Sequence, residues 1–166
     1  IRMLYVRGDR DKLLGERVLG NADLETLEIE IKALSKKLSP GDQVSIFLIG
    51  HGTDSGAEAK FNIVGPDITG GYFDDLLMDF SEQDLVVVDT TSASYGFARA
   101  LSDRGRVVVS ATRSASEKYD PVFAQYFVRG LENHNADRDK NGRVSVFEAF
   151  YYARVNVMSH YEDLDR

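Results

Sequence analysis

Oxygen-bearing side chains recur at fixed spacing between residues 137 and 148, in a segment that reads DRDKNGRVSVFE. Calcium prefers about six to eight oxygen ligands, and a twelve-residue calcium loop supplies them from positions 1, 3, 5, 7, 9 and 12, with glycine at position 6. Gly142 stands at position 6 of this segment. The expected ligands are Asp137, Asp139, Asn141, the Arg143 carbonyl oxygen, Ser145 (directly or through water) and Glu148. The spacing therefore predicts a Ca²⁺ site at 137–148.

The residues before this loop do not suit the first helix of a complete EF-hand, which is a helix, a loop and a second helix. Residues 130–136 are polar and begin at a glycine, so we expect the entering helix to end near Gly130 and the exiting helix to follow Glu148. Calcium sensors open a helix pair, and a single EF-hand-like loop instead favours a structural calcium site. The alternative is a solvated turn, for which Asp, Asn and Gly are also typical.

Two other segments place reactive side chains directly after apolar strands. His51 follows the run 44–49 between two glycines, and Ser92 follows the run 84–89 among small hydroxyl residues. Open α/β sheets form their sites beyond the carboxyl ends of the strands, so an imidazole and a hydroxyl would face one crevice if these strands are neighbours. Such a pair is typical of a base and a nucleophile. The alternative is that the hydroxyl residues cap a helix.

The elements that must position these residues alternate along the chain. Leucine and isoleucine recur at steps of three and four from Leu24 to Leu38, which predicts an amphipathic helix that begins near Asn21 or Asp23. Strands are predicted at 2–6, 44–49, 60–64, 84–89 and 106–111. Further helices are predicted at 72–80, 97–101 and 122–131. This alternation is typical of an α/β domain with a mostly parallel sheet.

Composition excludes several classes of function. The chain of 166 residues suits a single domain, and its hydrophobic fraction of 43% fits a globular protein. A net charge of -7 without clustered Lys and Arg does not fit a nucleic-acid-binding protein. The apolar runs are too short to span a bilayer. The chain has no cysteine, which excludes disulfides and a thiol nucleophile.

Two expectations concern origin and location. The chain opens on Ile1, and we expect it to be a processed or excised segment. Calcium loops of modest affinity are filled easily outside the cell, which gives a preference for an extracytoplasmic location, periplasmic or secreted.

The order of these segments resembles the legumain-like branch of the caspase-fold cysteine peptidases. In that family an apolar strand leads into His-Gly, a second leads into the nucleophilic cysteine, and a third leads into an Ala-Thr-rich turn at the substrate pocket. The corresponding segments here are IFLIGHGT at 46–53, LVVVDTTSAS at 85–94 and VVVSAT at 107–112. The resemblance covers about residues 40–131. It implies a caspase-like three-layer α/β/α sandwich with a mostly parallel sheet, and we expect one such domain over 1–166.

The chain departs from this family at the nucleophile. Ser92 takes the place of the cysteine when the segments are aligned on Ser94 and Gly96, and Thr91 takes it when they are aligned on Asp89. A cysteine beside a histidine can ionise to a thiolate, whereas a serine hydroxyl must lose its proton during the attack. The resemblance therefore implies a calcium-binding pseudo-peptidase that binds a peptide or protein.

Two other functions stay open. One is an active hydrolase in which Ser92 attacks a peptide carbonyl, His51 moves the proton, and backbone N–H groups near Gly52 and Ser92 hold the oxyanion. Ser92 is then either native or an engineered replacement of a catalytic cysteine. The other is an unrelated α/β domain whose only ligand is calcium. In the peptidase interpretations, the residues that correspond to the wall of the substrate pocket are Ser110, Ala111 and Thr112.

Overall fold

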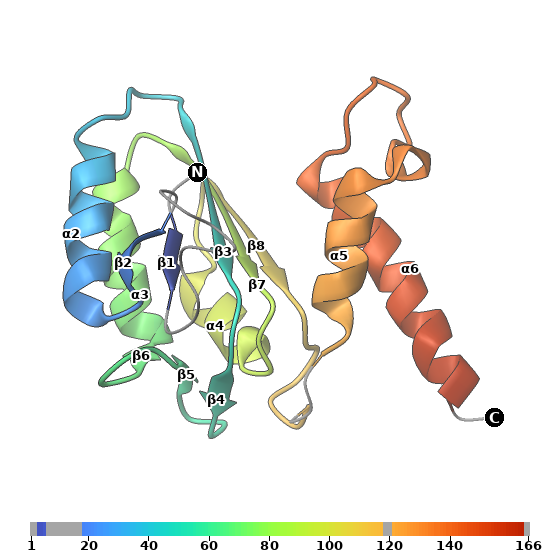
Figure 1. Ribbon diagram of the computed structural model, residues 1–166, viewed down its shortest axis with the longest axis horizontal. Coiled ribbons are helices and arrows are strands. Elements are labelled where there is room, and N and C mark those ends of the chain that lie inside the picture. The colour runs from blue at the N-terminus through green and yellow to red at the C-terminus, as the bar shows by residue number, and fades with distance from the viewer. Residues whose placement is uncertain (1–2, 6–17, 118–120, 165–166) are drawn as a thin grey trace. The chain divides into compact units, whose positions relative to one another are not determined.

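The computed structural model describes residues 3–5, 18–117 and 121–164. Within them the protein is an α/β structure with five α-helices and a parallel three-stranded sheet (Figure 1). The chain divides into two compact units, residues 1–118 and 119–166, and each is described by itself. The α/β class and the parallel sheet are confirmed. The caspase-like three-layer arrangement and the single domain stay predictions.

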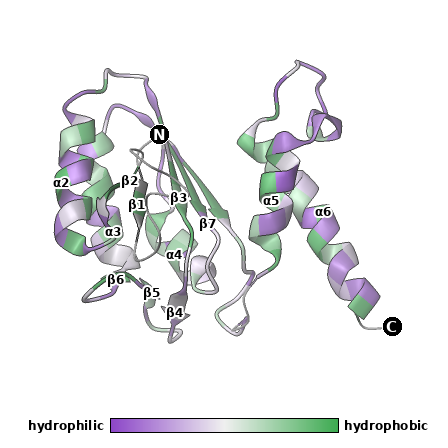
Figure 2. Cartoon of the chain, in the orientation of Figure 1, coloured by the Kyte–Doolittle hydropathy of each residue, from purple (hydrophilic) through white to green (hydrophobic). Residues whose placement is uncertain are grey.

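The sheet of the first unit has the strand order β3–β7–β8 (Figure 1). Its strands are β3 (Gln43–Leu48), β7 (Asp84–Asp89) and β8 (Arg106–Ser110). The central strand β7 is buried from residue 85 to 89 and, like β8, is hydrophobic along most of its length (Figure 2). Continuous apolar strands are typical of parallel sheets, and all three predictions agree with the structure within one residue. Asp89 pairs with Leu48 and with Ser110, so the three carboxyl ends meet at one edge.

Three helices of the first unit share a core with alternate residues of this sheet. They are α2 (Leu24–Ser35), α3 (Gly70–Leu77) and α4 (Ser94–Leu101). Among the buried residues of this core are Ile31, Val44, Leu48, Phe73, Leu77, Val87, Phe97 and Leu101. The Asp23 carboxylate accepts the Thr26 N–H at 2.9 Å and caps α2 where the sequence predicts its start.

A small antiparallel sheet follows β3 and was only partly predicted. It consists of β4 (Gly52–Asp54), β5 (Ala59–Phe61) and β6 (Ile68–Thr69) in that order. The predicted strand 60–64 corresponds to β5, whereas β4 and β6 were missed. Thr69 caps α3 by accepting the Tyr72 N–H at 3.1 Å, so α3 begins at Gly70, before the predicted residue 72. The end of the predicted helix is the 3-10 helix η2 (Met78–Phe80).

Two short strands near the N-terminus form a separate parallel pair, β1 (Met3–Tyr5) with β2 (Val18–Asn21). The predicted strand 2–6 is confirmed at residues 3–5, and its two end residues lie outside the described part of the chain. The sequence did not predict β2. In the middle of the unit, α4 begins at Ser94, three residues before the predicted start at Phe97.

The second unit is a pair of helices, α5 (Phe123–Glu132) and α6 (Val146–Leu164), with the 3-10 helix η3 (His134–Ala136) between them. A Cβ atom on Gly130 would lie 3.1 Å from both Cα and the carbonyl oxygen of Ala149, so the glycine lets α5 approach α6 closely. Tyr126 Oη on α5 lies 3.3 Å from His160 Nδ1 on α6. No helix in the described residues is long and apolar enough to cross a membrane.

Candidate functional site

The loop between η3 and α6 gathers three of the six predicted calcium ligands. Asp137, Asp139 and Glu148 each offer a carboxylate oxygen, and these oxygens lie within 4.8 Å of one another. Glu148 is buried, Asp137 is half-buried and Asp139 is exposed. Hard cations such as Ca²⁺ prefer carboxylate oxygens. The fold therefore brings together the acidic residues at loop positions 1, 3 and 12, which could hold a metal ion.

The backbone of the loop turns around these carboxylates. Lys140 and Gly142 adopt left-handed conformations with φ of 59° and 84°, and the predicted glycine stands where such a conformation costs least. The Asn141 N–H donates to Asp137 Oδ1 at 3.1 Å and to Asp139 Oδ1 at 3.0 Å. The Gly142 N–H donates to Asp137 Oδ2 at 2.9 Å. Backbone donors thus fix the two aspartate side chains on the inside of the turn.

Glu148 is the most constrained side chain of the loop, with an exposed fraction of 5%. Its Oε2 accepts the Ser145 N–H at 2.9 Å and the Ser145 hydroxyl at 2.7 Å. Its Oε1 accepts the Arg138 N–H at 2.7 Å and the Asp139 N–H at 3.3 Å. These hydrogen bonds, those from Ser145 first, lower the pKa of Glu148 to about 2. The carboxylate at position 12 is therefore ionised and oriented at neutral pH.

Ser145 and Glu148 also determine where α6 begins. The Glu148 N–H donates to Ser145 Oγ at 3.2 Å, while the Ser145 N–H donates to the Glu148 carboxylate. This reciprocal pair is a capping box, whose sequence signature is Ser-x-x-Glu. The predicted exiting helix after Glu148 is confirmed, but it begins before that residue, because α6 starts at Val146. The sequence contains this signature, but the same two residues also have the spacing of metal ligands, and only that role is predicted for them above.

The remaining predicted ligands make hydrogen bonds within the loop. Asn141 Oδ1 accepts the N–H of the exposed Arg143 at 2.9 Å, and Asn141 Nδ2 donates to Asp139 Oδ2 at 2.9 Å. Ser145 Oγ donates to Glu148, as described above. A cation at this position would compete with the Arg143 N–H for Asn141 Oδ1 and with the Glu148 N–H for Ser145 Oγ.

The second candidate site lies in the first unit, where the carboxyl ends of β3 and β7 meet. These strands are parallel neighbours, which is the condition under which the sequence predicts a shared crevice. Ser92 Oγ donates a hydrogen bond to the Gly52 carbonyl oxygen at 3.1 Å. Thr90 donates both its N–H and its hydroxyl to the Leu48 carbonyl oxygen, at 3.0 and 2.9 Å. The segments that follow the two strands are thus joined directly, with the exposed His51 next to Gly52.

Gly52 packs against the turn at 91–93. This turn contains Thr91 and Ser92, the two residues that could stand in place of the cysteine nucleophile. A Cβ atom at this position would lie 2.6 Å from Ala93 Cβ, 2.7 Å from Thr91 Oγ1 and 3.0 Å from the Lys60 carbonyl oxygen. Thr91 is buried, with an exposed fraction of 1%, and Ser92 is half-buried. Both alignments of the missing cysteine therefore place a hydroxyl beside Gly52.

The hydrogen bonds of this turn leave one backbone donor available. The Thr91 N–H donates to Asp89 Oδ1 at 2.9 Å, the Ala93 N–H to Thr91 Oγ1 at 3.2 Å, and the Ser94 N–H to the Thr91 carbonyl oxygen at 3.3 Å. Among the hydrogen bonds of the described residues, none uses the Ser92 N–H. Such an amide can donate to a ligand carbonyl, which is how oxyanion sites are built.

Asp89, at the end of β7, is a residue of this site that the sequence did not reveal. Its side chain is completely buried, Oδ1 accepts the Thr91 N–H, and Oδ2 has no hydrogen-bond partner among the described residues. Burial raises the pKa of Asp89 to about 6, and the hydrogen bonds from Thr91 oppose that shift. The available signal was a carboxylate at the last position of an apolar strand.

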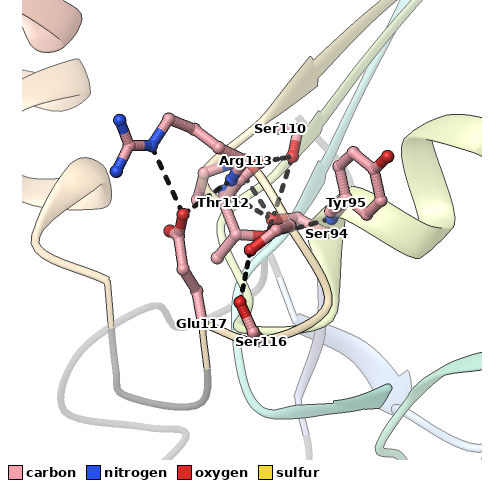
Figure 3. A network of polar contacts seen from close by, with 9 residues as sticks. Ser94, Tyr95, Ser110, Thr112, Arg113, Ser116 and Glu117 are labelled. Atoms are coloured by element: carbon pink, nitrogen blue, oxygen red, sulfur yellow. Dashed lines mark hydrogen bonds and ion pairs between the residues drawn. The ribbon is translucent and has the colours of Figure 1, made fainter. Parts of the chain in front are cut away.

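The three residues predicted at the substrate pocket form a polar network with Ser94 (Figure 3). Ser94 Oγ accepts the N–H groups of Ala111 and Thr112, each at 3.0 Å, and lies 3.0 Å from Thr112 Oγ1. Thr112 Oγ1 also accepts the Tyr95 N–H at 3.0 Å, and Ser110 Oγ donates to the Thr112 carbonyl oxygen at 2.6 Å. This network joins the end of β8 to the start of α4. The role of these residues in a substrate pocket stays a prediction.

Comparisons with known proteins add no relative: no family model, no curated protein and no solved structure matches this chain.

Proposed function

We propose that this protein binds one calcium ion in the loop 137–148 and that the ion has a structural role. The observation that carries the proposal is the cluster of carboxylate oxygens from Asp137, Asp139 and Glu148, within 4.8 Å of one another. The ionised, hydrogen-bonded state of Glu148 supports it, because position 12 of such a loop supplies a bidentate carboxylate. The close contact between Gly130 and Ala149 supports a fixed helix pair rather than one that opens.

Calorimetric titration of the metal-free protein with CaCl₂ is expected to give a single binding site. Glu148→Gln keeps the size of the side chain but removes its charge, so we expect the affinity to fall by more than about tenfold, which corresponds to about 1.4 kcal/mol. Glu162→Gln is the matched control, because Glu162 is an exposed glutamate on the same helix. This control should bind calcium like the parent protein.

Absence of binding heat in the parent protein would refute the proposal, and the loop would then be a solvated turn. If Glu148→Gln and the parent protein bind calcium with equal affinity, residues other than Glu148 hold the ion. A parallel titration with MgCl₂ identifies the metal, because Mg²⁺ requires a smaller, near-octahedral site and loses its water reluctantly.

We further propose that the first unit is a caspase-like domain whose crevice binds a peptide or protein carbonyl without cleaving it. The Ser92 N–H supports carbonyl binding, because it is the donor that the turn leaves unused. The Ser92 hydroxyl donates its proton to the Gly52 carbonyl oxygen, whereas a serine nucleophile requires a base to accept that proton. The order β3–β7–β8 and the helices α2, α3 and α4 in one core support the fold. An extracytoplasmic location, rich in calcium, is part of this proposal.

Chemical labelling distinguishes a pseudo-peptidase from an active hydrolase. A fluorophosphonate, which phosphonylates activated serines with loss of fluoride, is expected to leave the parent protein unlabelled. Ser92→Cys then reports on His51: we expect the pH profile of its alkylation by iodoacetamide to have a midpoint below the usual thiol pKa of about 8.5, because a neighbouring imidazolium stabilises a thiolate. Ser81→Cys is the control, at an exposed serine of the same unit, and should keep the ordinary midpoint.

Each result has a definite meaning. Fluorophosphonate labelling of the parent that disappears in Ser92→Ala would show an active hydrolase and overturn the pseudo-peptidase proposal. If the alkylation of Ser92→Cys has the ordinary midpoint of a thiol, His51 does not interact with position 92. That result would favour an unrelated α/β domain.

A further inference from the structure

Asp89 combines three properties that a residue with a purely structural role does not need. It is a carboxylate at the end of the central strand, it is completely buried, and one of its oxygens has no partner among the described residues. Buried polar atoms are normally hydrogen-bonded, and an unpaired buried carboxylate oxygen is costly. A hydrophobic residue at this position, like its neighbours Val86 to Val88, would avoid that cost. The carboxylate at this position, and the hydrogen bond that it accepts from the Thr91 N–H, therefore need a functional explanation.

That bond is the first in a chain of hydrogen bonds that ends at the crevice. Asp89 holds the Thr91 N–H, and Thr91 in turn accepts the N–H groups of Ala93 and Ser94 through its hydroxyl and its carbonyl oxygen. Ser92, between them, has an N–H without a partner among the described residues and a hydroxyl that donates to the Gly52 carbonyl oxygen. The orientation of Ser92 thus depends on a turn that the Asp89 carboxylate anchors at its start.

Resting on the crevice proposed above, we infer that Asp89 is a positioning residue for carbonyl recognition. Asp89 acts through its hydrogen bond with the Thr91 amide. While the Asp89 carboxylate is ionised, this bond fixes the turn so that the Ser92 N–H points toward the ligand. When a proton binds to Oδ2, the bond weakens and the Ser92 N–H is no longer fixed in that direction. An ionised acceptor forms a hydrogen bond about twice as strong as a neutral one. Protonation therefore weakens the anchor of the turn without removing it.

The elements around Asp89 bring no competing charge to it. Its strand partners are Leu48 on β3 and Ser110 on β8. The titratable groups on the adjacent elements are Arg106 on β8 and Tyr95 and Arg99 on α4. None of them contributes to the raised pKa of Asp89, whose causes are burial and the Thr91 hydrogen bonds. Arg106 is at the opposite end of β8, where its guanidinium pairs with Asp74.

The test is a pH titration of the isotope-labelled full chain followed by NMR. The carboxyl carbon of Asp89 and the amide protons of Thr91 and Ser92 are recorded as the pH falls from neutral into the acid range. We expect the carboxyl carbon and the Thr91 amide to change with one common midpoint at about pH 6. The Ser92 amide should follow with the same midpoint, because the turn transmits the change. The protection factor of the Thr91 amide, which corrects its exchange rate for the slower intrinsic exchange in acid, should also fall at the acid end.

Two variants separate positioning from folding. Asp89→Asn keeps an oxygen acceptor for Thr91 but cannot titrate, so the common midpoint should disappear from both amides while the protein stays folded. Asp84→Asn is the control, because Asp84 is an exposed aspartate at the start of the same strand, and it should leave the midpoint unchanged. The titration needs no ligand, so a crevice that binds nothing would not alter its outcome and would fail only the labelling experiments above.

A Thr91 amide that stays constant while Asp89 titrates would overturn the inference. The inference would also be overturned if the chemical shift of the Ser92 amide stays constant while that of Thr91 changes. Protonation of Asp89 would then not affect the part of the turn that lines the crevice. An Asp89 midpoint at the ordinary value for aspartate, about 4, would show that the carboxyl group is hydrated and has no special role.

Discussion

Chelating calcium with EGTA is expected to lower the melting temperature of the protein by about 5–10 °C. A ligand that binds only the folded state stabilises it by about 2.7 kcal/mol when its concentration is a hundred times its Kd. For a chain of this size, each kcal/mol shifts the melting temperature by about 2–4 °C. Thermal unfolding in millimolar CaCl₂ and in EGTA, followed by circular dichroism, measures the difference directly.

The physical reason for this effect is charge repulsion within the loop. Three carboxylates with oxygens inside 4.8 Å repel one another when no cation lies between them. Backbone N–H groups offset part of that repulsion, which is why the loop can keep its shape, but a divalent cation neutralises two of the three negative charges. The effect should therefore be local, with the greatest loss of hydrogen-exchange protection in α5 and α6.

Two variants define the expected result further. Glu148→Gln should respond to EGTA by at most about half as much as the parent protein, because a site at least tenfold weaker stabilises the folded state by at most about 1.4 kcal/mol at the same calcium concentration, whereas Glu162→Gln should respond like the parent protein. A parent protein whose melting temperature ignores EGTA would refute the structural role of calcium, even if binding heat is detected.

The parts of the fold that the sequence predicts well are those in which one local pattern determines the outcome. The strands of the parallel sheet are apolar runs, of which the central strand β7 is buried on both faces, and their positions agree with the predictions within one residue. The acidic cluster of the loop 137–148 is equally local, since Asp137, Asp139 and Glu148 are specified by their positions in twelve consecutive residues. In both cases the sequence pattern is long enough that few other local structures would fit it.

The parts that were missed depend on contacts between distant segments or on residues with two roles. The strands β4 and β6 have three and two residues, too few to show an alternating pattern. Ser145 and Glu148 have the spacing of metal ligands and of a capping box, and only the first was recognised. The apolar run before Asp89 indicates a buried strand but not a buried carboxylate, whose burial arises because β3 and β8 flank it on both sides.

Gly52→Ala is expected to destabilise the protein by about 1–3 kcal/mol, the usual cost of an overpacked site. The added methyl group would lie 2.6 Å from Ala93 Cβ and 3.0 Å from the Lys60 carbonyl oxygen. The carbonyl oxygen belongs to the backbone, so it cannot rotate away from the methyl group. The turn has to move instead, and that movement would break the hydrogen bond between Ser92 and Gly52. Denaturant unfolding of the variant and the parent measures the loss.

Gly50→Ala is the control that isolates this clash. Neither glycine has a positive φ, so alanine should reduce the entropy of the unfolded chain by a similar amount in both variants. At position 50 the new methyl group would meet only the Phe61 ring, at an ordinary distance of 3.5 Å. The difference between the two variants is therefore the cost of separating Gly52 from the 91–93 turn. If both variants are equally stable, the two segments are not packed as tightly as this contact requires, and the crevice has no rigid wall on which to position Ser92.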